Sequence, residues 1–345
     1  MGIDVQKFLF EYDGSTVKLM EVCGTHTAQI SQCGIPSMLS SKIQLVSGPG
    51  CPVCVTVTDY IDKLVELGKS QQNVIVTFGD MMRVTGKTAS LSDAKANGAQ
   101  VRMVYSPMET LELASMDTSK TFIFAAIGFE TTTPIYALLI QEAILRGITN
   151  IKILTSLKTM PSAIDWVCQN KTGIDGFLAP GHVSAITGSK IFDGLAKKYG
   201  MPFAVVGFEG EQILKAIAVL VKSRGLGRVM NLYPEVVTVQ GNEIAQQIVA
   251  KYFIECDAAW RGFGVIKGSG MMLRKEYSGF DAGSWGMDND RGHNPKCRCA
   301  QVLTGGINPT QCPLFGNECT PSSQQGACMV SSEGSCYNYY INKRT

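Results

Sequence analysis

Two thiols placed two residues apart mark the stretch of the chain best suited to chemistry. Cys51 and Cys54 stand in Gly-Pro-Gly-Cys-Pro-Val-Cys at 48–54. Proline fixes φ and glycine permits close backbone approach, so this stretch predicts a stiff turn that presents both sulfurs in one direction. It lies between a predicted strand at 43–47 and a helical period ending at Gly68, and a helix N-terminus lowers the pKa of nearby thiols. The pattern favours a redox-active dithiol or half of a metal site over two merely buried residues.

A second thiol stands beside an imidazole earlier in the chain. Cys-Gly-Thr-His-Thr at 23–27 follows a predicted short strand, and Cys23 and His26 are three residues apart. This spacing suits a metal chelate or a Cys/His nucleophile pair, although a single such pair also arises by coincidence. Because the C-x-x-C motif follows closely in sequence, we expect Cys23, His26, Cys51 and Cys54 to converge.

Six further cysteines crowd the last fifty residues. Four of them, Cys297, Cys312, Cys319 and Cys336, follow the pattern C-x14-C-x6-C-x16-C, and Cys299 and Cys328 form an extra pair. Glycine and proline punctuate this segment, so we expect little regular structure, and thiolate-bound metal commonly replaces a core in such segments. Four thiolates suit zinc or an iron–sulfur cluster, and the wide spacing favours a cubane over a zinc knuckle.

Polar side chains also follow several predicted strands directly. Asp80 and Arg83 come after one strand, Glu130 after another and His182 after a third. Ligands of α/β proteins bind outside the carboxyl ends of strands, so we expect these four residues to line a cleft. Helix capping is an equally weighted explanation for Thr residues 131–133. The sequence has no glycine-rich phosphate-binding motif.

The elements that must position these residues alternate between strand and helix. We expect strands at 43–47, 73–78, 100–105, 121–127, 151–156, 176–179 and 203–207. We expect helices at 58–68, 92–97, 108–115, 134–146, 163–169, 190–199 and 211–224. Continuous apolar strands between amphipathic helices are typical of parallel sheets covered on both faces. Residues 230–270 return to apolar alternation and close onto the first sheet, whereas 262–286 is glycine-rich and loop-like.

We therefore predict an α/β fold of two similar parallel-sheet domains and a loop-rich iron–sulfur domain. The first α/β domain takes residues 40–117 plus about 226–262, and the second takes 118–225, with a break at 118–120. The iron–sulfur domain takes 1–39 plus 263–345 and carries both termini.

Composition and charge exclude several classes of protein. The chain has 345 residues and a formal net charge of +2, which gives no electrostatic reason to expect nucleic acid or an anionic membrane as partner. It contains no apolar run of the roughly 18–20 residues that cross a bilayer. We find no secretory leader and expect a cytoplasmic protein. In a reducing compartment, 12 cysteines indicate metal or redox use instead of a disulfide framework.

Taken together, the motifs resemble those of the HypD family of [NiFe]-hydrogenase maturation factors, from about residue 18 to 340. The resemblance rests on the stretches at 23–27 and 48–54, on Thr-Phe-Gly-Asp-Met-Met-Arg-Val at 77–84, on Gly-Phe-Glu-Thr-Thr-Thr-Pro at 128–134, on Pro-Gly-His-Val at 180–183, and on the six-cysteine tail. The chain departs from the family pattern at Thr85, at Gly210 and at 322–325.

The resemblance implies a cytoplasmic scaffold for the Fe(CN)2CO unit of the hydrogenase. It implies that the small chaperone HypC helps to hold the iron, that HypE delivers cyanide, and that the hydrogenase large subunit receives the product. Cys23 resembles the iron-binding thiolate and His26 its neighbour, while Cys51 and Cys54 resemble the redox pair. Cys297, Cys312, Cys319 and Cys336 resemble the [4Fe–4S] ligands, and Cys299 and Cys328 resemble the relaying thiol pair.

Two other functions compete with the scaffold. One is a stand-alone thiol–disulfide oxidoreductase that uses Cys51 and Cys54 on protein substrates. The other is a binding module stapled by zinc. Cys23 and His26 discriminate the first alternative, because a simple oxidoreductase does not need them.

Overall fold

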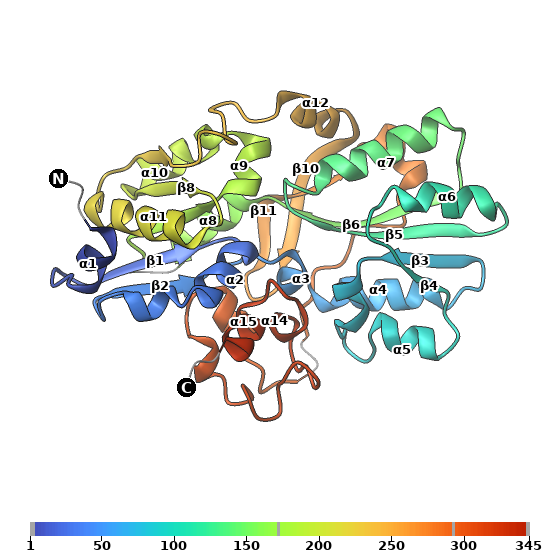
Figure 1. Cartoon of the computed structure of the whole chain (residues 1–345). Helices are drawn as coiled ribbons and strands as arrows, with labels where there is room; N and C mark the ends of the chain where they lie inside the picture. The colour runs from blue at the N-terminus through green and yellow to red at the C-terminus, as the bar shows by residue number, and fades with distance from the viewer. Residues whose placement is uncertain (1–3, 171–172, 292–293, 343–345) are drawn as a thin grey trace.

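The strands form two sheets that lie side by side (Figure 1). The computed structural model describes residues 4–170, 173–291 and 294–342. The five-stranded sheet has the spatial order β2 (Ile43–Ser47), β1 (Val17–Glu21), β7 (Gly176–Pro180), β8 (Phe203–Val206) and β9 (Val229–Asn231). Its neighbouring strands are all parallel.

The six-stranded sheet is mixed. Its spatial order is β10 (Phe253–Trp260), β11 (Gly264–Leu273), β6 (Ile151–Lys158), β5 (Thr121–Gly128), β3 (Asn73–Thr77) and β4 (Val101–Met103). β11 runs antiparallel to both β10 and β6, and the other pairs are parallel. Every residue of β5 after Thr121 is buried, as expected for a parallel strand covered on both faces. The predicted α/β class is therefore confirmed.

Helices connect and cover the strands. The α-helices are α1 (Val5–Phe10), α2 (Gly24–Gln32), α3 (Pro52–Val55), α4 (Thr58–Gly68), α5 (Leu91–Ala96), α6 (Glu109–Met116), α7 (Thr133–Leu145), α8 (Met160–Asn170), α9 (Gly181–Thr187), α10 (Asp193–Tyr199), α11 (Gly210–Lys222), α12 (Glu243–Tyr252), α13 (Cys299–Leu303), α14 (Ala327–Val330) and α15 (Ser335–Ile341). Short 3-10 turns are η1 (Ile35–Met38), η2 (Gly79–Arg83), η3 (Ser189–Phe192), η4 (Lys275–Phe280) and η5 (Pro309–Gln311). Among the described residues, no helix is both long and apolar enough to cross a bilayer.

Three apolar clusters hold these layers together. One packs α1 and α11 on the five-stranded sheet, and a second packs α6 and α7 on the six-stranded sheet. The third is central and reaches both sheets, since it joins Phe177 of β7 to Ile123 of β5. It also contains Cys54 and Cys328, so the cysteine-rich tail packs on the same core as the sheets. Figure 1 shows this tail as a separate lobe beneath both sheets.

The strands are shared between the sheets differently from the residue ranges that we expected. β2 pairs with β1 in the five-stranded sheet and not with β3, whereas β5 pairs with β3 across the expected break at 118–120 and β6 pairs with β5. α1 packs on α11 beside the five-stranded sheet, whereas α2 packs on α15 of the tail. Pairing between strands that are distant in sequence has no local sequence signal. The expected domain ranges therefore differ from the division of the strands between the two sheets.

A second difference concerns the segment after residue 230. Residues 236–239, read as apolar alternation, form no strand, and the segment read as a loop contains β11. β10 and β11 do close onto the sheet that contains β3. Glycines at 264, 268 and 270 masked the strand signal, and positive φ at Gly264 and Gly268 shows that two of them serve turns or irregular positions.

Candidate functional site

Cys23 lies where β1 ends and α2 begins. It is the N-cap residue of α2 in an extended conformation, and its thiol is buried. The Cys23 N–H donates to Glu21 Oε2 at 3.0 Å, and Thr27 Oγ1 donates to Glu21 Oε1 at 2.5 Å. Burial raises the pKa of Glu21 to about 7. A buried carboxyl therefore fixes the backbone on which Cys23 is carried.

The loop at 48–54 packs directly on this backbone. Gly24 N donates to Gly50 O at 3.0 Å, and Gly48 N donates to Glu21 O at 2.7 Å. A Cβ added to Gly50 would lie 2.2 Å from Cys23 N, a distance that no real side chain can occupy. The glycine at position 50 thus lets the two cysteine-bearing segments touch backbone to backbone.

Cys51 and Cys54 form a disulfide at the start of α3. The Cys51 and Cys54 side chains are only 3% and 0% exposed. The Cys54 N–H donates to Cys51 Sγ at 3.1 Å. The pair that we predicted as redox-active is therefore oxidised here and shielded from solvent.

The cysteine-rich tail contacts this disulfide through Ala327. Cys54 Sγ lies 3.9 Å from the carbonyl oxygen of Ala327, the residue before Cys328. Cys328 Sγ in turn lies 2.8 Å from Cys299 Sγ. The hydrogen bond from Cys328 lowers the pKa of Cys299, and the same interaction raises the pKa of Cys328. The second predicted pair is thus brought together as two thiols beside the disulfide.

His26 lies in the first turn of α2, three residues after Cys23, and is buried. Its Nε2 hydrogen-bonds to Gly207 O at 2.9 Å, so Nε2 carries the proton and donates it. Nδ1 has no partner among the described residues, and burial lowers the pKa of His26 to about 4. Phe208 lies between the rings of His26 and His182, with centroid distances of 5.0 Å and 4.0 Å. His182, in α9 directly after β7, therefore joins the surroundings of His26 through an aromatic stack.

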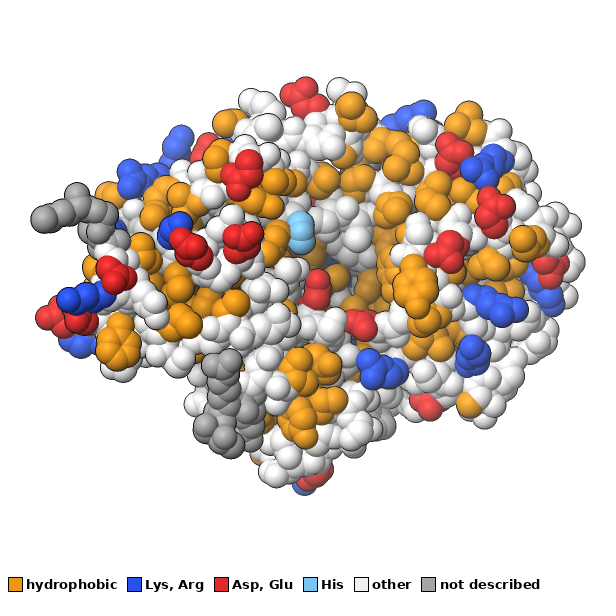
Figure 2. Space-filling model, in the orientation of Figure 1, with side chains coloured by type: hydrophobic (Ala, Val, Ile, Leu, Met, Phe, Trp, Pro, Cys, Tyr) orange, Lys and Arg blue, Asp and Glu red, His pale blue; other side chains and the backbone are white. Residues whose placement is uncertain are grey.

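Asp80 and Arg83 face the tail. Arg83 Nη2 donates to Val330 O at 3.3 Å, and the charge of Asp80 adds to burial in raising the pKa of Glu333. Glu333 packs so closely on Gly24 that a Cβ there would lie 2.4 Å from it. Figure 2 shows that the face above this lobe is hollowed between the two halves of the molecule.

Glu130 lies in the turn between β5 and α7. Its Oε1 accepts from Met160 N at 2.8 Å, and its buried Oε2 has no partner among the described residues. Burial raises the pKa of Glu130 to about 7. No hydrogen bond or ion pair within the described segments joins Glu130 to a cysteine or to His26.

The four tail cysteines predicted as cluster ligands share one lobe. Burial raises the pKa of Cys297 to about 12 and also raises the pKa of Cys319. The charges of Cys312 and Cys336 raise the pKa of both thiols further. A Cβ on Gly326 would lie 2.6 Å from Cys297 Sγ. Within the described ranges, no three His, Cys, Asp or Glu side chains are grouped as ligands of one metal ion. An all-sulfur donor set in one small lobe, with a glycine beside it, fits the chemistry of an iron–sulfur cluster.

Burial raises the pKa of Cys23 to about 12, and the charges of Glu333 and Glu21 raise it further in that order. Without a bound cation, this sulfur is therefore a protonated thiol. A soft metal ion that bound here would displace the proton and would compensate the two carboxyl groups.

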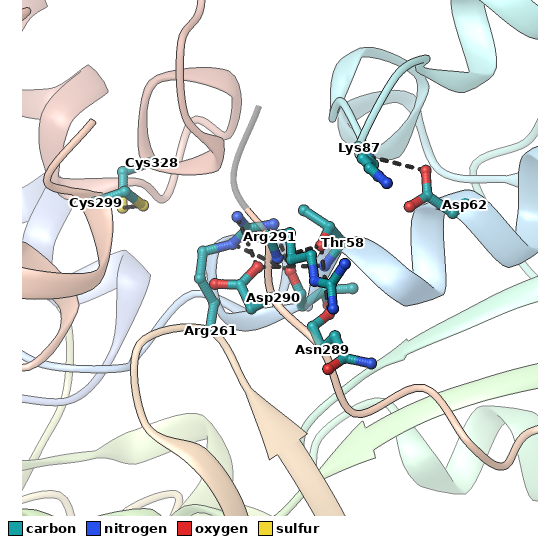
Figure 3. A network of polar contacts seen from close by, with 10 residues as sticks. Thr58, Asp62, Lys87, Arg261, Asn289, Asp290, Arg291, Cys299 and Cys328 are labelled. Atoms are coloured by element: carbon teal, nitrogen blue, oxygen red, sulfur yellow. Dashed lines mark hydrogen bonds and ion pairs between the residues drawn. The ribbon is translucent and has the colours of Figure 1, made fainter. Parts of the chain in front are cut away.

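The structure adds residues that sequence reasoning missed. Glu21 had a signal, since it is a charged residue two positions before Cys23 at the end of a short strand, whereas Glu333 in the irregular tail had none. Arg261 had none either, although its buried guanidinium binds Thr56 O at 2.7 Å and Asp290 at 3.1 Å (Figure 3). Arg261 and Asp290 also line a cavity of about 310 Å³ together with Cys297 and Cys299.

One departure from the expected motifs now has a physical reason. Gly210 begins α11, and a Cβ at this position would lie 2.8 Å from Cys33 Sγ. The absence of a side chain at 210 therefore leaves room for the Cys33 sulfur.

Comparison with known proteins gives one consistent result. A family model described as "HypD: Hydrogenase formation hypA family" matches residues 5–343. The chain is 41% identical over 333 residues to the hydrogenase maturation factor HypD of Escherichia coli strain K12, covering 94% of this chain and 88% of that protein. It is 38% identical over 339 residues to the hydrogenase expression/formation protein HupD of Azotobacter chroococcum, covering 95% and 89%. It is 38% identical over 340 residues to HypD of Cupriavidus necator, covering 95% and 90%.

Proposed function

The chain belongs to the HypD family of hydrogenase maturation factors, and on that premise we propose that it is the scaffold on which the Fe(CN)2CO unit is assembled. The observation that carries this proposal is the direct packing of the Cys51–Cys54 loop on the backbone of Cys23. It places a buried single thiol beside a buried disulfide. A scaffold needs both, because one sulfur must hold the iron while another pair exchanges electrons.

Cys23 holds the iron as substrate in this proposal. Its sulfur loses the proton that burial retains, and the soft thiolate suits an iron that carries cyanide and carbon monoxide. Glu21 fixes the Cys23 backbone, and Glu333 adds negative charge beside it. His26 contributes a neutral imidazole whose Nε2–H is committed to Gly207, so Nδ1 is its free nitrogen.

The sulfurs of the tail form a path toward the disulfide. Cys297, Cys312, Cys319 and Cys336 hold a [4Fe–4S] cluster, which supplies single electrons when bound. Cys328 Sγ contacts Cys299 Sγ, and the residue before Cys328 contacts Cys54 Sγ, so in this proposal Cys299 and Cys328 exchange with the Cys51–Cys54 disulfide through thiolate attack. Attack by one thiolate opens the disulfide, and the second thiol of the attacking pair then resolves the mixed disulfide. Cys51 and Cys54 end as two thiols, and Cys299 and Cys328 end as a disulfide.

The partners in this proposal are those of the family resemblance. HypC contributes a further ligand to the iron, HypE delivers the cyanide groups, and the hydrogenase large subunit receives the finished unit in the cytoplasm. The hollow in Figure 2 gives a second protein access to the region between the two halves.

Burial of the disulfide disfavours the alternative of a stand-alone oxidoreductase. Such an enzyme presents one sulfur to a protein substrate, whereas Cys51 and Cys54 are 3% and 0% exposed. A disulfide that is buried against the tail is better placed for exchange with the tail cysteines than for attack on a large protein substrate.

Genetic complementation tests the function. In a cell that lacks its own copy of this factor, the wild-type chain restores hydrogenase activity and C23S does not. C168S is the matched control, since Cys168 lies outside the thiol cluster and is only partly buried. Full activity with C23S would overturn the scaffold role, and restored thiol–disulfide exchange on an added protein substrate without maturation would favour the oxidoreductase.

A further inference from the structure

Lys158 is a buried lysine that the proposed function does not use. It ends β6, its side chain is 2% exposed, and its Nζ donates to Ser156 Oγ at 2.7 Å. Nζ also lies 5.7 Å from the ring centroid of Trp260. Throughout the described parts of the chain, no carboxylate forms an ion pair with Lys158 within 4.0 Å. An ammonium group has three donors, and among the described residues Ser156 Oγ is the one acceptor that Lys158 Nζ finds.

This lysine lines a cavity beside the carboxyl end of β6. The cavity has a volume of about 170 Å³ and is lined by residues 155–158 of β6, by 256–259 in the middle of β10, and by Met271 and Met272 of β11. Ser156 and Ser284 add hydroxyl groups to its lining, and Cys256 adds a thiol. Carboxyl edges of parallel strands are where ligands of α/β proteins bind. The volume holds several water molecules and is too small for a nucleotide.

The charges around the cavity limit what it accepts. One cation with a single acceptor among the described residues favours an oxygen-bearing anion, because charge-assisted hydrogen bonds offset the burial of both partners. Asp257 and Asp288 also line the cavity and are exposed, so they repel ligands that carry several negative charges. A single negative charge on a small ligand meets both conditions.

We propose that this cavity binds a small monoanion of the carboxylate or oxyanion class through the Lys158 ammonium. The inference is independent of the scaffold function. Burial lowers the pKa of Lys158 to about 7; Cys256 opposes this effect, and Arg261 adds to it. A bound anion raises the pKa of Lys158 again, since it stabilises the charged form of the lysine.

Titration with formate tests the proposal. Sodium formate replaces sodium chloride at constant ionic strength, and binding is followed by calorimetry on the full chain. The wild type takes up one formate saturably, and K158M lowers the affinity at least tenfold. K152M is the matched control, since Lys152 lies on the same strand and its Nζ binds Gly279 O instead. Uptake by K158M equal to that of the wild type, or no saturable uptake by the wild type, would overturn the proposal.

A second measurement needs no variant. Wild-type chain labelled with ¹³C at the lysine ε position gives one resonance that titrates near neutral pH. Saturating formate moves this titration to higher pH, while chloride at the same concentration leaves it in place. If formate leaves the titration unchanged, the cavity is not an anion site.

Discussion

The backbone of Gly50 lies against that of Cys23, and Gly24 N donates to Gly50 O at 3.0 Å. Two segments separated in sequence by a helix and a strand therefore share one backbone contact at the centre of the proposed site. The contact depends on the missing side chain, because a Cβ on Gly50 would lie 2.2 Å from Cys23 N and 2.5 Å from its Cα.

G50A therefore tests whether this contact positions Cys23. We expect the alanine to push the two segments apart, to cost about 1–3 kcal/mol of unfolding free energy and to abolish maturation while the tail cysteines remain loaded. G194A is the control, since a Cβ at Gly194 meets nothing within 4 Å. Chemical denaturation and hydrogenase activity measure the two effects. Full maturation with G50A would show that the contact is dispensable.

The Cys299 and Cys328 sulfurs, 2.8 Å apart, predict a specific disulfide on mild oxidation. We expect one equivalent of diamide, added to protein purified without oxygen, to link these two residues first. Peptide mapping after rapid alkylation detects the bond. C328S leaves Cys299 alkylated, and C168S serves as control. Linkage of Cys299 to a different cysteine in the wild type would contradict the exchange path.

The buried carboxyl of Glu130 predicts a pH-dependent stability. Its pKa is about 7 in the folded state against 4.5 for the ordinary group, so the folded state holds the proton longer than the unfolded state. Stability from this group is complete below pH 4.5 and is lost as the pH rises through 7. E130Q removes the titration and therefore gains about 2–3 kcal/mol relative to the wild type between pH 4.5 and 8.

Urea unfolding at several pH values measures this gain. E211Q is the control, since Glu211 is exposed on α11 and forms an ion pair with Lys215. A difference between E130Q and the wild type that stays constant with pH would mean that Glu130 titrates alike in both states.

Arg261 joins three segments, and its replacement tests that role (Figure 3). Its guanidinium donates twice to Thr56 O and pairs with Asp290, a geometry that one ammonium cannot reproduce. We expect R261K to lose about 1–3 kcal/mol and to lower the Tm by several degrees. R291K is the control, because the exposed Arg291 contacts Thr58 through its backbone N–H. An unchanged Tm for R261K would show that the pairing is dispensable.

Local patterns predicted most of the elements. The strands β2, β3 and β6 begin where the sequence places them, because continuous apolar runs ended by polar residues are a local signal. The pairing of β1 with β7 and of β5 with β6 has no such signal, so the division into sheets was not predictable. We did not predict β11, because its glycines are typical of a loop.

The candidate site shows the same limit. The motif cysteines and His26 are reactive or metal-binding residue types, so the sequence alone identifies them as candidate site residues. Glu333, Phe208 and Arg261 act through contacts made only when distant segments fold together, and their residue types alone predict no role. For Glu130, its place after a strand predicted a cleft residue, and folding brings its Oε1 to the amide of Met160, a contact that no local pattern indicates.

Infrared spectroscopy tests the central claim most directly. The chain is purified without oxygen together with HypC, the small chaperone that we propose as its partner, and cyanide and carbon monoxide stretches are recorded where proteins do not absorb. The scaffold account predicts bands for both ligands in the wild type and in C168S, and none in C23S. Bands of equal intensity in C23S would contradict the assignment of Cys23 as the thiolate that holds the iron.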